Sequence, residues 1–213
     1  MTRILVIGAS SGIGLETVRV ALAEGLAVRA FSRSADRIAI EHPALERING
    51  DALNPADIAA ALDRVDAVVQ TLGIAIGPQR LLEPIRLFSD ATRILVPAME
   101  AAGIERLITV TGFGAGDSAS AIGCLERIPF RLLLGAAYDD KSIQESLIRN
   151  SALDWTIVRP VILTNGPASH QVHALVAPET WRWGTVSRAD VAEFLVGQIG
   201  SNDYRKTAVV LTS

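Results

Sequence analysis

The residues Gly8–Gly14 (GASSGIG) have the composition and spacing of a loop that holds a phosphate group. They follow a short apolar run, Arg3–Ile7, and precede a helical pattern, so the loop connects a strand to a helix. Glycines let the chain turn sharply and let an anion approach the backbone without hindrance from a Cβ atom. The N–H groups and the dipole of the following helix then face that anion. The spacing GxxxGxG in this context predicts a dinucleotide pyrophosphate site; the alternative is a tight turn that binds nothing.

A second anion site is predicted where the apolar run Ala27–Phe31 (AVRAF) ends. Ser32 and Arg33 come next, and Arg37 follows four residues later. In a dinucleotide-binding fold this strand end faces the adenosine ribose, where a carboxylate favours a free 2′-hydroxyl and an arginine favours a 2′-phosphate. The strand end carries no carboxylate, so the sequence predicts NADPH rather than NADH. Arg33 is the stronger candidate, because Arg37 could also be a solvated charge beside Asp36.

Other residue groups that could do chemistry give weaker patterns. His170 and His173 have metal-ligand spacing, but no acidic residue or cysteine beside them completes a set, so no metal site is predicted. Trp181 and Trp183 flank an arginine, and this pattern is more typical of loop packing than of a stacking surface. The chain has neither a nucleophile elbow nor a Walker lysine, so hydrolase and kinase functions lack support.

The elements that must position these residues alternate along the chain. Strands are expected at residues 3–7, 27–31, 47–49, 66–70, 106–111, 155–158 and 208–211. Helices are expected at residues 12–23, 55–62, 85–102, 139–150 and 188–199, with Asn54 and Ser187 as N-caps and Pro97 as the site of a kink. A loop through Gly73, Gly77 and Pro78 is expected after the fourth strand, and residues 161–185 are expected to be irregular.

This alternation predicts an α/β Rossmann fold: a doubly wound parallel sheet between two helical layers, with a short irregular C-terminal substrate region. The chain has 213 residues, of which 49% are hydrophobic and 20% charged, so one domain over residues 1–213 is expected. The net charge of −3 argues against nucleic acid as a partner. No apolar run is long enough to cross a bilayer, and the first residues do not resemble a signal peptide, so no membrane partner and a cytoplasmic location are expected.

The chain resembles the short-chain dehydrogenase/reductase superfamily, and within it the atypical NAD(P)H-binding proteins of NmrA-like and flavin/biliverdin reductase type. Gly8–Gly14 carries the resemblance to the superfamily. Ser151–Pro160 (SALDWTIVRP) and Val186–Val191 (VSRADV) carry the resemblance to the atypical branch. The segments 31–33, 49–52, 69–73 and 109–112 also match. The resemblance implies that cofactor contacts come from Gly8, Ser10, Ser11, Gly12, Ile13, Arg33, Arg37, Asp51, Ala52, Thr71, Leu72, Gly73, Thr111, Lys141 and Pro160.

Typical members of the superfamily use a serine, and a tyrosine and lysine in YxxxK spacing, as the catalytic set. By resemblance, Lys141 is the lysine, and the tyrosine position is Ala137. Tyr138 lies one residue later, which would place it on a different helical face from that position. Gly112 stands where many relatives carry the serine, and Thr111 has a hydroxyl that could bind the nicotinamide side or a substrate, or could simply be satisfied within the fold. Thr111, Tyr138 and Lys141 are therefore the candidate catalytic residues.

Two functions follow from this pattern. The first is an NADPH-dependent oxidoreductase that acts on a flavin, quinone or small carbonyl, since flavins and quinones can take their proton from water. The second is a redox sensor or regulatory protein of NmrA type that binds NAD(P) without turnover and acts through a protein partner. The missing serine and the displaced tyrosine favour the second function, and the cofactor loop together with Lys141 favours the first.

Overall fold

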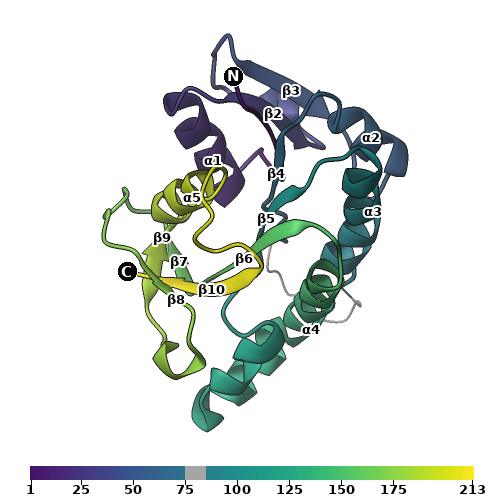
Figure 1. Cartoon of the computed structure of the whole chain (residues 1–213). Coiled ribbons are helices and arrows are strands. Elements are labelled where there is room, and N and C mark those ends of the chain that lie inside the picture. The colour runs from purple at the N-terminus through teal and green to yellow at the C-terminus, as the bar shows by residue number, and fades with distance from the viewer. Residues whose placement is uncertain (75–84) are drawn as a thin grey trace.

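Strand segments at the two ends of the chain join in one central sheet (Figure 1). A computed structural model describes residues 1–74 and 85–213, without the side chains of residues 124–127, 129 and 130. The strands of the sheet are β1 (Arg3–Ile7), β2 (Ala27–Ser32), β3 (Leu45–Asn49), β4 (Ala67–Gln70), β5 (Arg106–Val110), β6 (Asp154–Pro160), β8 (His173–Leu175) and β10 (Thr207–Thr212). Their order is β3-β2-β1-β4-β5-β6-β10-β8. The pairs are parallel except β10–β8, which is antiparallel.

Helices cover both faces of this sheet, as the alternation of strands and helices predicts. They are α1 (Gly12–Ala23), α2 (Pro55–Ala61), α3 (Leu87–Ala101), α4 (Cys124–Arg149) and α5 (Arg188–Gly197). The side chain of Asn54 accepts a hydrogen bond from the N–H of Ala56, and that of Ser187 accepts one from Asp190, so both predicted N-caps are confirmed. Pro97 lies inside α3, and the helix continues through it.

Alternate residues of β1 point into two separate cores. Ile4 and Val6 pack with α1 and α5, whereas Leu5 and Ile7 pack with α2, α3 and α4. All four side chains are almost fully buried. A parallel strand that is covered on both faces has a continuous run of apolar residues in the sequence, and residues 3–7 show this pattern. The Rossmann fold and its three layers are therefore confirmed.

Two predictions about the second half of the chain are wrong. Helix α4 begins at Cys124 and not at residue 139; Pro129 and Gly135 disfavour a helix in the sequence, and the first half of α4 projects from the body of the molecule (Figure 1). Residues 161–185 are not irregular throughout: they contain β8, and β7 (Ile162–Thr164) pairs with β9 (Thr185–Ser187) in a small second sheet. Such three-residue strands are too short to show a periodic pattern.

The remaining differences lie at the ends of elements. β3 begins two residues earlier than the strand predicted at residues 47–49, and β6 extends two residues beyond the strand predicted at residues 155–158, to Pro160. The predicted loop at Gly77 and Pro78 lies outside the described residues. No helix in the described part of the chain is both long enough and apolar enough to cross a bilayer.

Candidate functional site

The loop Gly8–Gly14 lies where the strand order reverses, between β1 and β4 at the carboxyl edge of the sheet. Gly8 and Gly12 have φ angles of +90° and +57°, a region that favours glycine. A Cβ atom on Gly14 would lie 2.1 Å from the carbonyl oxygen of Gly8, and one on Gly8 would lie 2.8 Å from that of Thr71. The backbone of this loop therefore packs closely against itself and against the residues that follow β4. These contacts leave no room for a Cβ atom on Gly8 or Gly14.

This loop forms a cradle that an anion fits. Ser11 is the N-cap residue of α1, has an extended backbone, and makes no side-chain hydrogen bond to the helix. Ser11 and Gly12 are exposed, and Ser10 and Ile13 are half-buried. The first-turn N–H groups of a helix lack intrahelical partners, so here they face an accessible loop. The residues present therefore fit a dinucleotide pyrophosphate.

The neighbouring loop after β4 supplies one wall of this cradle. The Thr71 hydroxyl donates a hydrogen bond to the carbonyl of Ile7 at 2.9 Å, which ties the ends of β1 and β4 together. Leu72 packs on the core formed with α2, α3 and α4, and Gly73 is exposed. The predicted residues Thr71–Gly73 thus lie beside the phosphate loop.

The predicted ribose and adenine residues follow β2 and β3. Arg33 and Arg37 are both exposed, and neither forms an ion pair with a described acidic residue. Asp51 occupies a turn, where its carboxylate accepts a hydrogen bond from Leu53 N–H at 3.0 Å. The next residue, Ala52, is buried. Two exposed arginines without an acidic partner among the described residues therefore lie at the end of β2, where the adenosine ribose is predicted.

The three candidate catalytic residues come together at the end of β5. The Lys141 ammonium donates a hydrogen bond to the carbonyl of Thr111 at 2.5 Å. It also lies 5.3 Å from the centre of the Tyr138 ring and 4.9 Å from that of Phe88. A Cβ atom on Gly112 would lie only 2.6 Å from the Tyr138 hydroxyl oxygen. The phenol therefore fills the space beside the position where many relatives carry a serine.

Tyr138 lies one residue after the family position, as the sequence predicts, and its hydroxyl still reaches Gly112 at the end of β5. The segment is helical, and Tyr138 precedes Lys141 by three residues, so the two side chains are neighbours on one face of α4. The family position, Ala137, is also buried. A tyrosine and a lysine thus adjoin in this chain with a spacing one residue shorter than usual.

Burial shifts the proton affinities of both side chains. Desolvation raises the pKa of the Tyr138 phenol to about 12. Desolvation also lowers the pKa of the Lys141 ammonium to about 8, although the nearby Glu145 carboxylate opposes this shift. At neutral pH the phenol therefore keeps its proton, and most of the lysine is charged.

A buried ion-pair network packs against the cluster of Thr111, Tyr138 and Lys141. The Thr111 hydroxyl donates a hydrogen bond to Glu145 at 2.7 Å, so it is satisfied within the fold. The Arg159 guanidinium binds the same carboxylate through Nε at 3.0 Å and Nη2 at 2.5 Å, and it also pairs with Asp117. Both Arg159 and Glu145 are almost completely buried. A Cβ atom on Gly116 would lie 2.3 Å from the Glu145 carboxylate, so this glycine leaves room for the ion pair.

Sequence reasoning missed the function of Arg159 and Glu145. A signal was present, because an arginine within the apolar strand Trp155–Pro160 needs a buried partner. In the loop after β5, the Asp117 carboxylate binds Arg159, and the Ser118 hydroxyl accepts a hydrogen bond from Gly114 N–H. Pro160 lies at the end of β6, where its carbonyl accepts a hydrogen bond from Phe113 N–H at 3.1 Å.

The C-terminal tryptophans cover the same edge of the sheet. Trp183 packs edge-on against Phe113, with ring centres 4.9 Å apart. The indole N–H of Trp181 donates a hydrogen bond to Leu175 O at 3.2 Å, and its ring lies 5.5 Å from the Arg159 guanidinium. The prediction that both rings pack a loop is confirmed. His170 pairs with Glu193 at 2.9 Å, and no group of three or more potential metal ligands occurs within residues 1–74 and 85–213.

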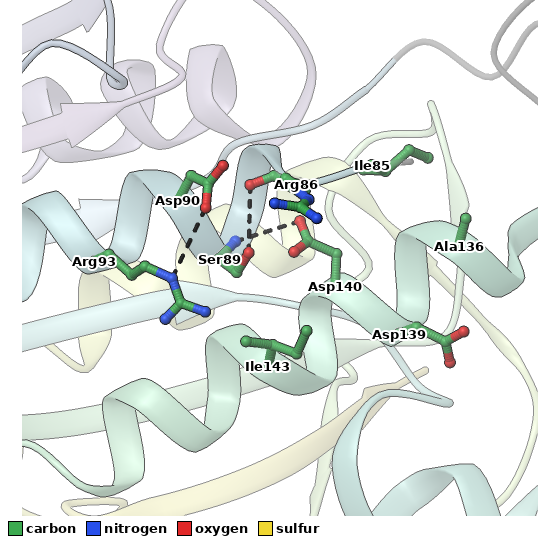
Figure 2. Close-up of a pocket in the computed structure, with 9 residues that line it drawn as sticks. All are labelled: Ile85, Arg86, Ser89, Asp90, Arg93, Ala136, Asp139, Asp140 and Ile143. Carbon is green, nitrogen blue, oxygen red and sulfur yellow. Dashed lines mark hydrogen bonds and ion pairs between the residues drawn. The ribbon is translucent and has the colours of Figure 1, made fainter. Parts of the chain in front are cut away.

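A separate cavity of about 460 Å³ lies between α3 and α4 (Figure 2). Its wall includes Ser89 of α3, and Ala136, Asp140 and Ile143 of α4. The Asp140 carboxylate accepts hydrogen bonds from the N–H groups of Phe88 at 2.8 Å and Ser89 at 3.3 Å, so α4 caps the first turn of α3. The spacing of these residues puts them on the face of α4 opposite Tyr138, Lys141 and Glu145. This cavity is therefore distinct from the cofactor edge.

Comparison with solved structures finds the same fold. ChuY from Escherichia coli O157:H7, described as an anaerobillin reductase, is 28% identical with a TM-score of 0.80, over 99% of this chain and 97% of that one. A short-chain dehydrogenase/reductase from Veillonella parvula in complex with NADP has a TM-score of 0.81 over 100% of this chain and 94% of that one. At 18% identity, the second likeness shows the fold alone.

Sequence comparison adds a longer plant relative and a family. Protein TIC 62, chloroplastic, from Oryza sativa subsp. japonica is 31% identical over 229 residues, which cover 96% of this chain and only 44% of the rice protein. The chain thus spans less than half of that relative. The model of an NAD(P)H-binding family matches residues 8–202, from the phosphate loop to beyond α5. The chain therefore belongs to this NAD(P)H-binding family.

Proposed function

We propose that the chain is an NADPH-dependent reductase that transfers a hydride to a flavin, a quinone or a small carbonyl compound. The observation that carries this proposal is the joint position of the Tyr138 hydroxyl and the Lys141 ammonium beside Gly112. This cluster lies at the carboxyl end of β5, the edge at which open α/β sheets bind their ligands. A proton donor and a cation are thus available next to the cofactor edge.

The preference for NADPH rests on charge. Arg33 and Arg37 are exposed at the end of β2 without an acidic partner among the described residues, so a 2′-phosphate would supply the missing counter-charge. In this proposal, Gly8 and residues 10–13 hold the pyrophosphate, and Asp51 and Ala52 border the adenine. Residues 71–73, Thr111, Lys141 and Pro160 line the path to the nicotinamide end.

The proposed chemistry divides a two-electron reduction between cofactor and protein. Bound NADPH supplies the hydride. Tyr138 donates the proton that a carbonyl oxygen needs, because the pKa of its phenol is raised to about 12 and the group stays protonated at neutral pH. The Lys141 ammonium, 5.3 Å from the phenol ring centre, stabilises the phenolate that remains until water returns the proton. A flavin or quinone can take its proton from water instead, so it depends less on Tyr138.

A solved structure supports the reductase part of this proposal. ChuY is described as a reductase, and its likeness covers 99% of this chain. Flavins and quinones can take their proton from water, so their reduction depends least on the displaced tyrosine. We therefore rank flavins and quinones before small aldehydes.

One observation favours the second function, a cofactor-binding sensor without turnover. The Thr111 hydroxyl and the Lys141 ammonium both have partners within the fold, namely Glu145 and the Thr111 carbonyl. A pocket whose polar groups are satisfied internally can hold a nucleotide without activating a substrate. This function requires a protein partner that responds to the bound nucleotide.

Nucleotide titration followed by acceptor addition separates the two functions. NADPH and NADH are titrated by fluorescence, and then a flavin, a quinone and a small aldehyde are added to the same sample. The reductase predicts tighter binding of NADPH than of NADH, and NADPH oxidation that depends on the acceptor. Tight binding without oxidation of any acceptor would favour the sensor, and absence of binding would contradict the cofactor proposal itself.

Tyr138→Phe tests the proton donor, with Tyr204→Phe as the matched control. Tyr204 is the only other tyrosine of the chain and packs on Phe194, among the residues around α5. We expect Tyr138→Phe to slow aldehyde reduction by about a hundredfold, in the range found for general acids, and to slow flavin reduction much less. An equal loss with both acceptors would contradict the proposed role of Tyr138.

A further inference from the structure

Arg188 lies at the phosphate loop although it is distant from that loop in the sequence. It is the first residue of α5, which packs along α1 on the same face of the sheet (Figure 1). A Cβ atom on Gly12 would lie 3.8 Å from Nε of Arg188. Gly12 begins α1 and is exposed, so this guanidinium faces the open side of the cradle described above.

The charge of Arg188 has no counter-ion within the described part of the chain. Its Nη1 donates hydrogen bonds to the carbonyl of Thr164 at 3.1 Å and to Oδ1 of Asn165 at 2.6 Å, and both acceptors are uncharged. These two bonds hold the head of a long, flexible side chain in one place. In the described residues no hydrogen bond uses Nε or Nη2, the nitrogens that remain for a ligand.

An anion in the loop would meet positive groups from two helices. The N-terminus of α1 carries first-turn N–H groups and the positive end of the helix dipole, and Ser11 leaves these groups uncapped. The Arg188 guanidinium adds a full charge and paired donors that match phosphate oxygens. We propose that Arg188 binds the cofactor pyrophosphate and closes the phosphate loop from the C-terminal part of the chain. This inference rests on the proposed dinucleotide site.

The pyrophosphate is common to NADPH and NADH, whereas the 2′-phosphate is not. Replacing Arg188 must therefore weaken the binding of both nucleotides by the same factor. Replacing Arg33 must weaken the binding of NADPH alone. Arg188→Lys keeps the charge but replaces the planar guanidinium that holds Thr164 and Asn165. Direct binding of the pyrophosphate therefore predicts that Arg188→Lys keeps part of the affinity, whereas support of the loop alone predicts that Arg188→Lys and Arg188→Gln lose affinity equally.

The experiment measures dissociation constants by fluorescence titration for the full chain and its variants. We expect Arg188→Gln to raise the constants for NADPH and NADH equally, by about tenfold or more, with a smaller rise in Arg188→Lys. Adenosine 2′-phosphate, which lacks the pyrophosphate, should bind Arg188→Gln and the wild type equally. Arg182→Gln is the matched control, because Arg182 is an exposed arginine of the same region.

Each other outcome overturns the inference in a distinguishable way. Unchanged affinities in Arg188→Gln would show that the residue does not touch the nucleotide. Weaker binding of NADPH alone would assign it to the 2′-phosphate. An equal loss of adenosine 2′-phosphate binding, or equal losses of affinity in Arg188→Lys and Arg188→Gln with a shifted thermal unfolding midpoint, would indicate a structural role. A wild-type chain that binds neither nucleotide would refute the cofactor proposal itself.

Discussion

The two ends of the cofactor edge are built from different materials. The phosphate loop consists mainly of backbone, with glycines and uncapped N–H groups around an open cradle, and exposed arginines lie beside it. The region around Tyr138 and Lys141 is made of side chains, supported by a buried pair of Glu145 and Arg159. The first end is shaped to receive charge from a ligand. The second end already carries its own compensated charges.

This difference indicates which substitutions should change folding stability and which should change nucleotide affinity. Exposed cations such as Arg33 contribute little to folding, because water solvates them when no ligand is present. A buried ion pair has lost its water and depends on each partner for compensation. Substitutions of the exposed arginines beside the phosphate loop should therefore change mainly affinity, and substitutions of the buried ion pair beneath Tyr138 should change mainly stability.

Removing Arg159 should have the largest effect on stability. Arg159→Met leaves the Glu145 carboxylate buried without its main partner, and we expect the free energy of unfolding to fall by about 3–5 kcal/mol. Urea unfolding measures it. The double variant Glu145→Leu/Arg159→Met should recover most of the loss, because both charges are gone. A loss below about 1 kcal/mol in the single variant would mean that the pair is not the support proposed above.

Lys141 should make stability depend on pH. Its pKa is about 8 in the folded chain and 10.5 in the reference state. Below pH 8 both states carry the charge, and burial opposes folding. Between about pH 8 and 10.5 the folded lysine loses its proton first, so the unfolding free energy should rise by about 3 kcal/mol relative to Lys141→Met. Urea titrations of both proteins without cofactor measure this difference; parallel curves would contradict the buried-lysine assignment.

Alanine substitutions of two glycines should lower the free energy of unfolding by intermediate amounts, and a second substitution should restore stability in only one of them. Gly112→Ala puts a Cβ atom 2.6 Å from the Tyr138 hydroxyl, and Gly14→Ala puts one 2.1 Å from a backbone oxygen. We expect each to cost about 1–3 kcal/mol by overpacking. The added change Tyr138→Phe should relieve only Gly112→Ala, since it removes the contacted oxygen. Thermal unfolding of the three single and two double variants tests this, and equal costs for Gly112→Ala in both backgrounds would refute the contact.

The smallest change in stability is expected at the strand end that carries the arginines. Arg33→Met should alter the unfolding free energy by less than about 0.5 kcal/mol, because the side chain is exposed and unpaired among the described residues. The same variant should lose most of its preference for NADPH over NADH. Unfolding curves and nucleotide titrations on one preparation test both statements. A large loss of stability would end the distinction between the two regions.

The sequence alone determined the elements and the loop that lie along continuous stretches of chain. The apolar run 3–7, the glycines up to Gly14 and the helix that ends at Ala23 act within one βα unit, so composition and spacing were sufficient to predict them. The strand end at Arg33 was predictable for the same reason. The cap at Asn54 also depends on neighbours only two residues apart.

Only the tertiary structure decided how the other end of the site is assembled. Thr111, Glu145 and Arg159 come from β5, α4 and β6, and nothing in the local pattern of any one segment specifies the other two. The shifted tyrosine adjoins Lys141 because α4 is helical there, and because Gly112 leaves space for its hydroxyl. Arg188 reaches the phosphate loop only because α5 packs on α1. Local backbone preferences are encoded residue by residue, whereas compensation of a buried charge requires that distant segments meet.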